Sequence, residues 1–237
     1  DKDGLITNER ALDGPGSEPL RGFVRNRTDL PDSSSLVDVI RAAKPTTLLG
    51  VSTVKGLFTE EVLREMGKIN ERPIIMPLSN PTSRAECTAE EAARATGGRA
   101  IFSAGSPFED VEIDGRAMKA NQGNNFYVFP GLGLGAVLSK SRVISDGMLQ
   151  AAALAIPNML TSAQYESGTI FPSIDRIRDI SAYVAVKVIE AAAREGRVPD
   201  EIRRLVATGE DAISEYVYST MYLPTYRPTV FSCSSRK

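Results

Sequence analysis

The chain has 237 residues, of which 42% are hydrophobic and 24% are charged, and its formal net charge at pH 7 is −2. These values are typical of a soluble globular protein with one large or two smaller domains, and they point to neither nucleic acid nor a membrane as a partner. The chain has no histidine and only two cysteines, Cys87 and Cys233. An imidazole base and a disulfide framework are therefore excluded within it, and an intracellular, reducing compartment is expected, whether cytoplasm, mitochondrion or plastid.

The first 32 residues are polar and rich in Gly, Pro and Asp. We interpret them as the end of a strand followed by a long loop, and we expect the amino terminus of the protein to lie upstream. An acidic residue at the end of such a strand can bind the hydroxyls of a ribose, which makes Asp1 a candidate ligand-binding residue.

Between residues 33 and 104, amphipathic and short apolar segments alternate. The spacing predicts βαβ units and therefore an α/β domain with a parallel sheet. Gly97 and Gly98 are suited to end the last helix in a left-handed conformation. The predicted helices cover residues 33–41, 60–66 and 86–95; Ser33–Ser35 can cap the first and Thr59 can cap the second. The predicted buried strands cover residues 46–51, 73–78 and 99–104.

The turn after the strand 73–78 carries Asn80, which would lie at the carboxyl edge of the sheet, where open α/β folds bind ligands. Ser83 and Glu86 have the spacing of a capping box, so we expect the next helix to begin near Glu86. We expect Glu86, like the acidic residues near it, to be a capping or solvated group. Cys87 is expected to be a small buried residue.

A polar loop is predicted from residue 106 to residue 125, with a small hairpin turning at Asp114-Gly115. It ends in the amide-rich run Asn121-Gln122-Gly123-Asn124-Asn125. Together with Asn80, these amides can hold a carboxylate or a carboxamide by neutral hydrogen bonds. The alternative is that each asparagine simply stabilises its own turn.

Two glycine-containing segments invite a nucleotide-binding interpretation. The run from Gly50 to Gly56 lacks the residue order of a P-loop, but it forms a turn whose backbone N–H groups can face a cofactor. The run Gly131-Leu132-Gly133-Leu134-Gly135 lacks the full dinucleotide fingerprint, and close helix packing explains it better. From residue 128 onward, helices are predicted at 132–139, 146–156, 176–195 and 200–217. In the third of them an apolar stripe follows helical spacing: Ile177, Ile180, Val184, Val188 and Ala191.

These patterns alone leave a dehydrogenase cofactor domain and a non-catalytic interaction domain both open. Several longer motifs, occurring in order along the chain, resemble those of malic enzymes. They cover residues 1–6, 44–46, 56–59, 73–92, 98–108 and 122–131, and the resemblance extends to about residue 228.

The resemblance implies oxidative decarboxylation of (S)-malate to pyruvate and CO2, with reduction of NAD or NADP and with Mg2+ or Mn2+. It implies that Asn80, Asn124 and Asn125 bind the substrate. It also implies that Asp1, Gly50, Val51, Ser52 and Asn80 bind the cofactor.

The same resemblance implies three parts and a homo-oligomer, either a dimer or a tetramer. A Rossmann-like NAD(P)-binding domain would cover residues 1–125, with its amino end incomplete. A helical return to the substrate-side domain would cover residues 126–196, and a carboxyl-terminal helix and tail for oligomer contacts would cover residues 197–237.

The chain also departs from the family pattern. The family's catalytic tyrosine and lysine, its acidic metal ligands and its glycine fingerprint all precede the segment that begins at Asp1. We therefore expect no catalytic or metal-binding residue within this segment, and no activity from it alone; a non-catalytic cofactor-binding or assembly module is the alternative. Asn121 replaces a glycine that is usual in the family. Lys2-Asp3 differs from the Ser-Lys pair of NADP-preferring members: Asp3 would repel a 2′-phosphate and Lys2 would attract it, so the pair favours NAD only slightly.

Overall fold

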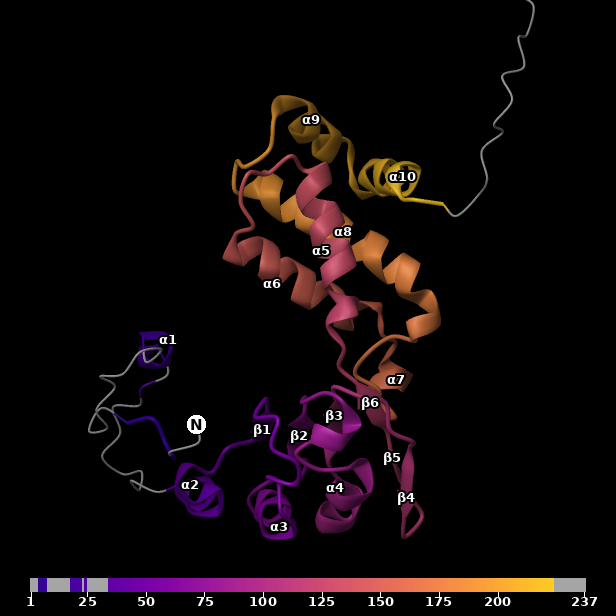
Figure 1. The fold of residues 1–237 in the computed structure, drawn as a ribbon. Coiled ribbons are helices and arrows are strands. Elements are labelled where there is room, and N and C mark those ends of the chain that lie inside the picture. Colours follow the sequence, from indigo (N-terminus) through magenta and orange to yellow (C-terminus); the bar gives the residue numbers. More distant parts are fainter. Residues whose placement is uncertain (1–3, 8–17, 23, 25–33, 224–237) are drawn as a thin grey trace, which may run out of the picture. The chain divides into compact units, whose positions relative to one another are not determined.

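A computed structural model describes residues 4–7, 18–22, 24 and 34–223 of the chain (Figure 1). Asp1, Asp3 and Cys233 lie outside these residues. The described chain divides into two compact units. The first contains the residues up to Phe126 together with Pro157–Ser173, and the second contains Tyr127–Ile156 and the residues from Ile174 onward.

The first unit is built on a parallel 4-stranded sheet with the strand order β1-β2-β3-β6. Apolar and β-branched residues make up most of the first three strands, as predicted. Hydrogen bonds from Leu78 N to Gly50 O and from Gly105 N to Pro77 O continue the pairing beyond the strand ends. The strands are β1 (Thr47–Gly50), β2 (Ile74–Pro77), β3 (Ile101–Ala104) and β6 (Ala120–Gln122).

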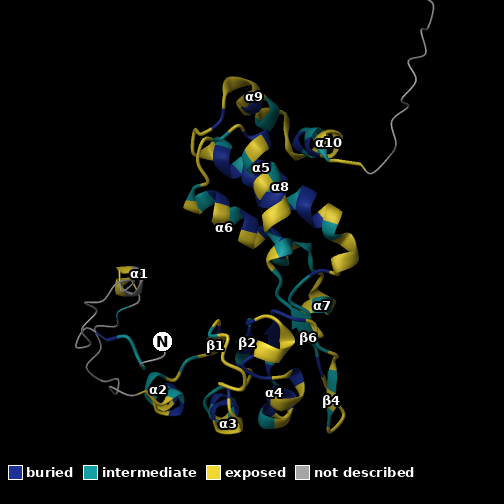
Figure 2. Ribbon diagram, viewed as in Figure 1, coloured by how far each residue is buried: buried dark blue, intermediate teal, exposed yellow. Residues whose placement is uncertain are grey.

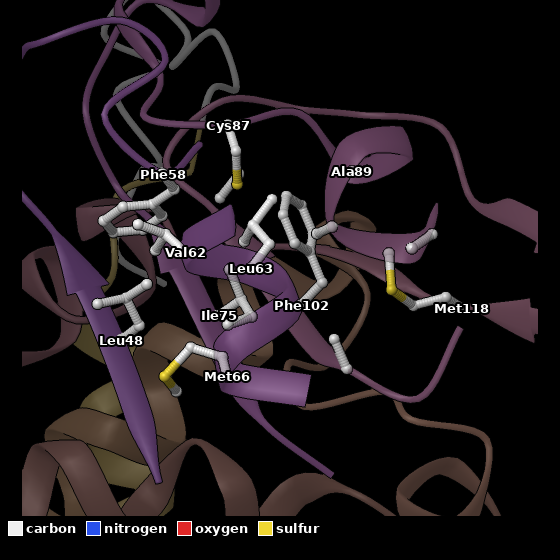
Figure 3. Close-up of a cluster of buried hydrophobic side chains, with 14 of the residues drawn as sticks. Leu48, Phe58, Val62, Leu63, Met66, Ile75, Cys87, Ala89, Phe102 and Met118 are labelled. Atoms are coloured by element: carbon white, nitrogen blue, oxygen red, sulfur yellow. The ribbon is translucent and has the colours of Figure 1, made fainter. Parts of the chain in front are cut away.

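Three capped helices accompany this sheet: α2 (Leu36–Ala43), α3 (Glu60–Ile69) and α4 (Ala89–Thr96). Ser35 and Thr59 cap α2 and α3 with their side chains, and Gly97 ends α4 with a φ of 61°, so the predicted helix signals are confirmed. Side chains of α3 and α4 pack on one face of the sheet and form a closed apolar core (Figure 3). That core includes Leu48, Ile75 and Phe102 from the strands and Val62, Leu63 and Met66 from α3.

The prediction that β1 is buried on both faces was wrong. Its side chains alternate between exposed and buried, and Leu49 is 54% exposed. The described part of the chain covers only one face of this strand, so the second apolar side chain remains accessible to solvent.

The start of α4 also differs from the prediction. Residues Thr82–Arg84 form a short 3-10 helix, and α4 begins at Ala89 behind Thr88. Thr88 and Glu91 form the capping box, with Thr88 Oγ1 accepting from Glu91 N and Glu91 accepting from Thr88 N. The sequence contains two possible capping boxes, Ser83–Glu86 and Thr88–Glu91. The second one forms, because the Glu86 side chain accepts hydrogen bonds from Ser52 and Ser79 instead.

The polar segment from residue 106 to residue 125 contains more structure than was predicted. The hairpin is confirmed as β4 (Val111–Ile113) and β5 (Arg116–Met118), with positive φ angles at Asp114 and Gly115. The segment then forms β6, a strand that was not predicted because its residues are polar. A short 3-10 helix, Asn125–Tyr127, follows β6.

The second unit is helical (Figure 1). The helices α5 and α6 pack on the long helix α8, whose buried residues Ile180, Val184 and Val188 confirm the predicted apolar stripe (Figure 2). The predicted helix 200–217 is interrupted at Gly209, which has a φ of 113°, so it forms two helices. The unit contains α5 (Phe129–Leu138), α6 (Asp146–Ala155), α8 (Ile177–Arg194), α9 (Asp200–Thr208) and α10 (Glu210–Thr220).

Shorter helical turns complete the described chain. They are α1 (Glu18–Arg21), η3 (Pro157–Met159), α7 (Ser162–Glu166) and η4 (Ile174–Arg176).

The glycine run of α5 serves helix packing, as predicted. A Cβ built on Gly131 would lie 2.5 Å from Val184 Cβ, and one on Gly135 would lie 2.7 Å from Val188 Cβ. A Cβ on Gly133 would meet nothing within 4 Å. Gly131 and Gly135 therefore allow α5 to approach α8 closely, whereas Gly133 has no such role.

This difference gives a matched test. We expect Gly131→Ala to destabilise the protein by about 1–3 kcal/mol because the new methyl group overpacks the contact with α8. Gly133→Ala should instead stabilise it by about 0.5–1 kcal/mol, since alanine favours the helix. Urea unfolding of the two variants measures both values, and equal effects would contradict the packing interpretation.

Candidate ligand site at the carboxyl edge of the sheet

The carboxyl ends of the four parallel strands bring together side chains that are far apart in the sequence. Ser52 follows β1, Asn80 follows β2, Ser106 follows β3 and Asn124 follows β6. Because the ends of neighbouring strands are aligned by the ladder, these residues lie along one edge. This is the edge at which α/β sheets bind ligands.

The edge is held by the buried carboxylate of Glu86, which is 0% exposed. Glu86 Oε1 accepts hydrogen bonds from Ser52 N at 2.8 Å, Ser52 Oγ at 2.8 Å and Ser79 Oγ at 2.6 Å. Its Oε2 accepts from Ser79 N at 3.4 Å. The carboxylate thus ties the turn after β1 to the turn after β2.

The electrostatics of Glu86 follow from this geometry. Burial raises the pKa of its carboxyl, but the hydrogen bonds from Ser79 and Ser52 lower it by more, so the pKa lies below its ordinary value of 4.5. Glu86 is therefore a charged group that donors, rather than a cation, stabilise inside the protein. The prediction that Glu86 caps a helix or faces solvent was wrong.

The residues on either side of Glu86 are compatible with its burial but do not predict it. Its neighbours Ala85 and Cys87 are apolar, and both are buried. Burial and the nearby carboxylates of Glu91 and Glu86 raise the pKa of the Cys87 thiol, so Cys87 is an inert packing residue, as predicted.

Gly50 is explained by Glu86 as well. A Cβ on Gly50 would lie 2.6 Å from Glu86 Cδ, so a larger residue there would displace the Glu86 side chain. Thr53, in the same turn, has a φ of 59°, which is strained for a β-branched residue. Its N–H donates to Ser79 Oγ at 2.9 Å. Hydrogen bonds to Glu86 and Ser79 therefore hold the turn after β1 in this strained conformation.

This packing constrains what the turn after β1 can offer to a ligand. Ser52 uses both its N–H and its hydroxyl to bind Glu86. Val51 is 70% exposed, so its apolar surface is available beside the strand end. Of Gly50, Val51 and Ser52, only Val51 presents its side chain outward, and the cofactor-binding role of all three stays a prediction.

Asn80 is exposed, and its amide is oriented by Ser106 from the neighbouring strand end. Ser106 Oγ donates to Asn80 Oδ1 at 2.7 Å. Gly105 permits this approach, because a Cβ on it would lie 2.3 Å from Leu78 O and 2.8 Å from Asn80 Nδ2. The acceptor atom of the Asn80 side chain is thereby engaged inside the protein.

Asn124 is arranged in a similar way. Its Oδ1 accepts a hydrogen bond from Phe126 N at 3.1 Å, which is the turn-stabilising bond expected of asparagine. Within the described chain, the Nδ2 groups of Asn80 and Asn124 have no hydrogen-bond acceptor. Asn125 is the exposed neighbour of Asn124.

The two amides can donate hydrogen bonds to a ligand, but their side-chain oxygens already accept hydrogen bonds within the protein. Two such donors suit a ligand that carries acceptors, such as a carboxylate, and they bind it without adding another charge. The structure thus places the predicted amides on one edge, and their substrate-binding role stays a prediction.

A cavity of about 310 Å3 lies elsewhere, at the amino edge of the sheet, with Arg72, Arg99 and Arg116 in its wall. Arg99 donates to Gly67 O and Asn70 O at the end of α3, and Arg116 lies 3.5 Å from Gly97 O at the end of α4. These two arginines interact with the carbonyl oxygens at helix carboxyl ends, where a positive charge is favourable.

The described residues contain no group of three or more Cys, Asp or Glu side chains that could hold a metal ion. Among the same residues, no helix has both the length and the apolar character needed to cross a membrane.

Comparison with known proteins supplies independent information. The family described as "Malic enzyme, NAD binding domain" matches residues 1–193. The chain is 40% identical to NAD-dependent malic enzyme 2, mitochondrial, of Arabidopsis thaliana, over 97% of the chain and 38% of that protein. It is 46% identical to NADP-dependent malic enzyme 4, chloroplastic, of the same plant, over 96% of the chain and 33% of that protein.

A solved structure has a related fold. The crystal structure of Entamoeba histolytica malic enzyme matches 92% of this chain and 42% of its own chain, with a TM-score of 0.68 and 24% sequence identity. The chain therefore spans well under half the length of the relatives that it matches.

The central role of Glu86 gives a prediction with a defined pH dependence. Glu86→Gln should lower the free energy of unfolding at pH 7 by about 1–3 kcal/mol, because an uncharged amide replaces an acceptor of several hydrogen bonds. The folded-state pKa of Glu86 is lowered, so its contribution is present above pH 4.5 and is lost as the pH falls below this value. The difference between wild type and variant should therefore shrink in acid.

Urea unfolding between pH 7 and about pH 3 measures this difference, because the contribution is lost only below pH 4.5. Glu90→Gln is the matched control, because Glu90 is an exposed partner of Arg94 and its replacement should cost less than about 0.5 kcal/mol. A Glu86→Gln effect that does not vary with pH would show that its charge is unimportant.

Proposed function

The chain belongs to the malic enzyme family through its NAD-binding domain, and from this membership we propose that the complete protein oxidatively decarboxylates (S)-malate to pyruvate and CO2 while reducing NAD or NADP. The observation that carries this proposal is the family match over residues 1–193. The donor-rich edge of the sheet supports it, because malate carries two carboxylates.

We assign substrate binding to Asn80, Asn124 and Asn125. The free NH2 groups of Asn80 and Asn124 would donate to carboxylate oxygens of malate. Malate must be held with its C2 hydrogen facing the nicotinamide, and fixed neutral donors achieve this orientation without a mobile charge. Asn125 is exposed beside Asn124 and would complete the same subsite.

We assign cofactor binding to Asp1, Gly50, Val51, Ser52 and Asn80. One feature of the turn after β1 supports this assignment: the exposed side chain of Val51 offers an apolar surface at the strand end, on which a cofactor could pack. Ser52 would act indirectly by shaping this turn through Glu86. NAD- and NADP-dependent relatives have similar identities to the chain, 40% and 46%, so identity favours neither cofactor.

The proposed reaction also calls for a divalent metal, Mg2+ or Mn2+, which would supply Lewis-acid stabilisation of negative charge on malate. The described residues supply no cluster to hold it. We therefore propose that the metal ligands, like the catalytic acid and base, belong to the remainder of the complete protein. The part played by this chain is to bind and orient.

The organisation of the complete protein is proposed in the same way. Residues 1–125 would form the cofactor domain, residues 126–196 would return to the substrate side and residues 197–237 would contact neighbouring subunits in a dimer or tetramer. Mass measurement in solution, with and without residues 197–237, tests the oligomer assignment.

The test of the reaction itself uses the complete protein with malate, NAD or NADP, and Mg2+ or Mn2+. We expect malate-dependent formation of the reduced cofactor, followed by absorbance, together with stoichiometric pyruvate. A complete protein that binds NAD(P) but forms no pyruvate would instead be a non-catalytic binding module.

The two substrate amides can be tested by isosteric change. Asn124→Asp keeps the oxygen that accepts from Phe126 N but replaces the free NH2 group with an oxygen. Asn80→Asp likewise keeps the acceptor for Ser106. Each variant should lower kcat/KM for malate by about 10- to 100-fold, because a donor to a carboxylate is lost and a repulsive charge is gained.

Thermal unfolding should be nearly unchanged in both variants, since the internal hydrogen bonds remain. For Asn124→Asp, the KM for NAD(P) should also be nearly unchanged. Steady-state kinetics with an unaltered kcat/KM for malate would remove the residue concerned from the substrate site.

A further inference from the structure

The side chain of Asn121 binds a segment distant in sequence, residues 168–171 (the fastened segment), to the outer edge of the sheet. Asn121 Nδ2 donates to Gly168 O at 2.9 Å, and Asn121 Oδ1 accepts from Ile170 N at 2.9 Å. One bond goes to a backbone carbonyl and the other comes from a backbone N–H, as in the pairing of two β-strands. In the described sheet β6 is an edge strand, so the Asn121 amide takes the place of a missing strand partner.

The same amide also binds the interior neighbour of β6. Asn121 Nδ2 donates to Phe102 O on β3 at 2.9 Å. Both hydrogens of the NH2 group therefore have strong acceptors, and the oxygen has a donor. An amide is the one side chain of this size that can supply two donors and an acceptor at once.

The fastened segment, residues 168–171, lies directly behind the turn that carries Asn124. A Cβ built on Gly123 would lie 3.6 Å from Phe171 Cε2 and 3.5 Å from Leu78 Cδ2. Gly123 is thus enclosed between the fastened segment and the residue that begins the Asn80 turn. A shift of residues 168–171 would be transmitted to Gly123 and hence to Asn124.

We propose that Asn121 is a positioning residue for malate: by holding residues 168–171 against β6, it fixes the backbone on which Asn124 presents its NH2 group. This inference rests on the proposed function. Asn121 does not touch the substrate; it acts through Gly123 and Asn124. The backbone of Asn121 is paired with β3, and its side chain binds residues 168 and 170. Both restrain the turn that begins two residues later at Gly123.

The test is kinetic and uses the complete protein. Asn121→Ala should raise the KM for malate by about 10-fold or more, because small displacements of a binding group have large effects on affinity. The KM for NAD(P) should change by less than about two-fold. Asn121→Asp has the same shape but loses both donors and faces two carbonyl oxygens, so it should show the same selective loss.

Asn70→Ala is the matched control. Asn70 is also a half-buried amide that donates to two backbone carbonyls, those of Pro45 and Met66, but it lies at the amino edge of the sheet. Asn70→Ala should lower Tm without raising the KM for malate. If the Asn121 variants lower Tm in the same way and leave the KM for malate unchanged, Asn121 is only structural and the inference fails.

A measurement on the unaltered protein decides the case even if the variants do not fold. Binding at Asn124 and order at residues 168–171 must be coupled reciprocally. Saturating malate should slow hydrogen exchange at the Ile170 amide more than at the Lys44 amide, which closes α2. Equal changes at both amides would overturn the inference. An unaltered protein with no malate activity would instead overturn the proposed function.

Discussion

The carboxyl edge of the sheet depends on one buried negative charge. Glu86 has no cation beside it in the described structure; its charge is stabilised by N–H and O–H groups of Ser52 and Ser79. An ionised carboxylate in such a place is costly unless several donors surround it. The two turns that bear these donors must therefore close around Glu86, and this requirement sets the glycine at position 50, the strained backbone at Thr53 and the late start of α4.

The two amides at the same edge use their side-chain oxygens within the protein and leave their NH2 groups for a ligand. Asn80 and Asn124 each direct the side-chain oxygen to a donor of the protein itself, from Ser106 and from the Phe126 backbone. What remains for a ligand is a pair of NH2 groups in fixed orientation. An asparagine that satisfies a turn and an asparagine that binds a carboxylate are thus compatible, because the turn uses the oxygen and the ligand would use the nitrogen.

Close approach recurs as a constraint in both units. Gly105 lets the turn after β3 lie against Leu78 O, and Gly131 and Gly135 let α5 lie against α8. In each case a methyl group would meet backbone or a branched side chain at less than van der Waals distance. Gly131 and Gly135, which resemble part of a nucleotide fingerprint, serve helix packing, while the side chains at the candidate ligand edge are those of serine and asparagine.

The sequence by itself determined the alternation of helices and strands, the caps at Ser35 and Thr59, the Asp114-Gly115 hairpin, the helix-packing role of the α5 glycines and membership of the malic enzyme family. These features depend on local periodicity, on capping chemistry or on long ordered motifs, all of which are written in contiguous residues. Only the tertiary structure decided that Glu86 is buried, that β6 is a strand and that Asn121 binds residues 168–170. Their partners lie between 7 and 49 positions away along the chain, and a polar residue is stable in such a place only after distant segments have folded around it.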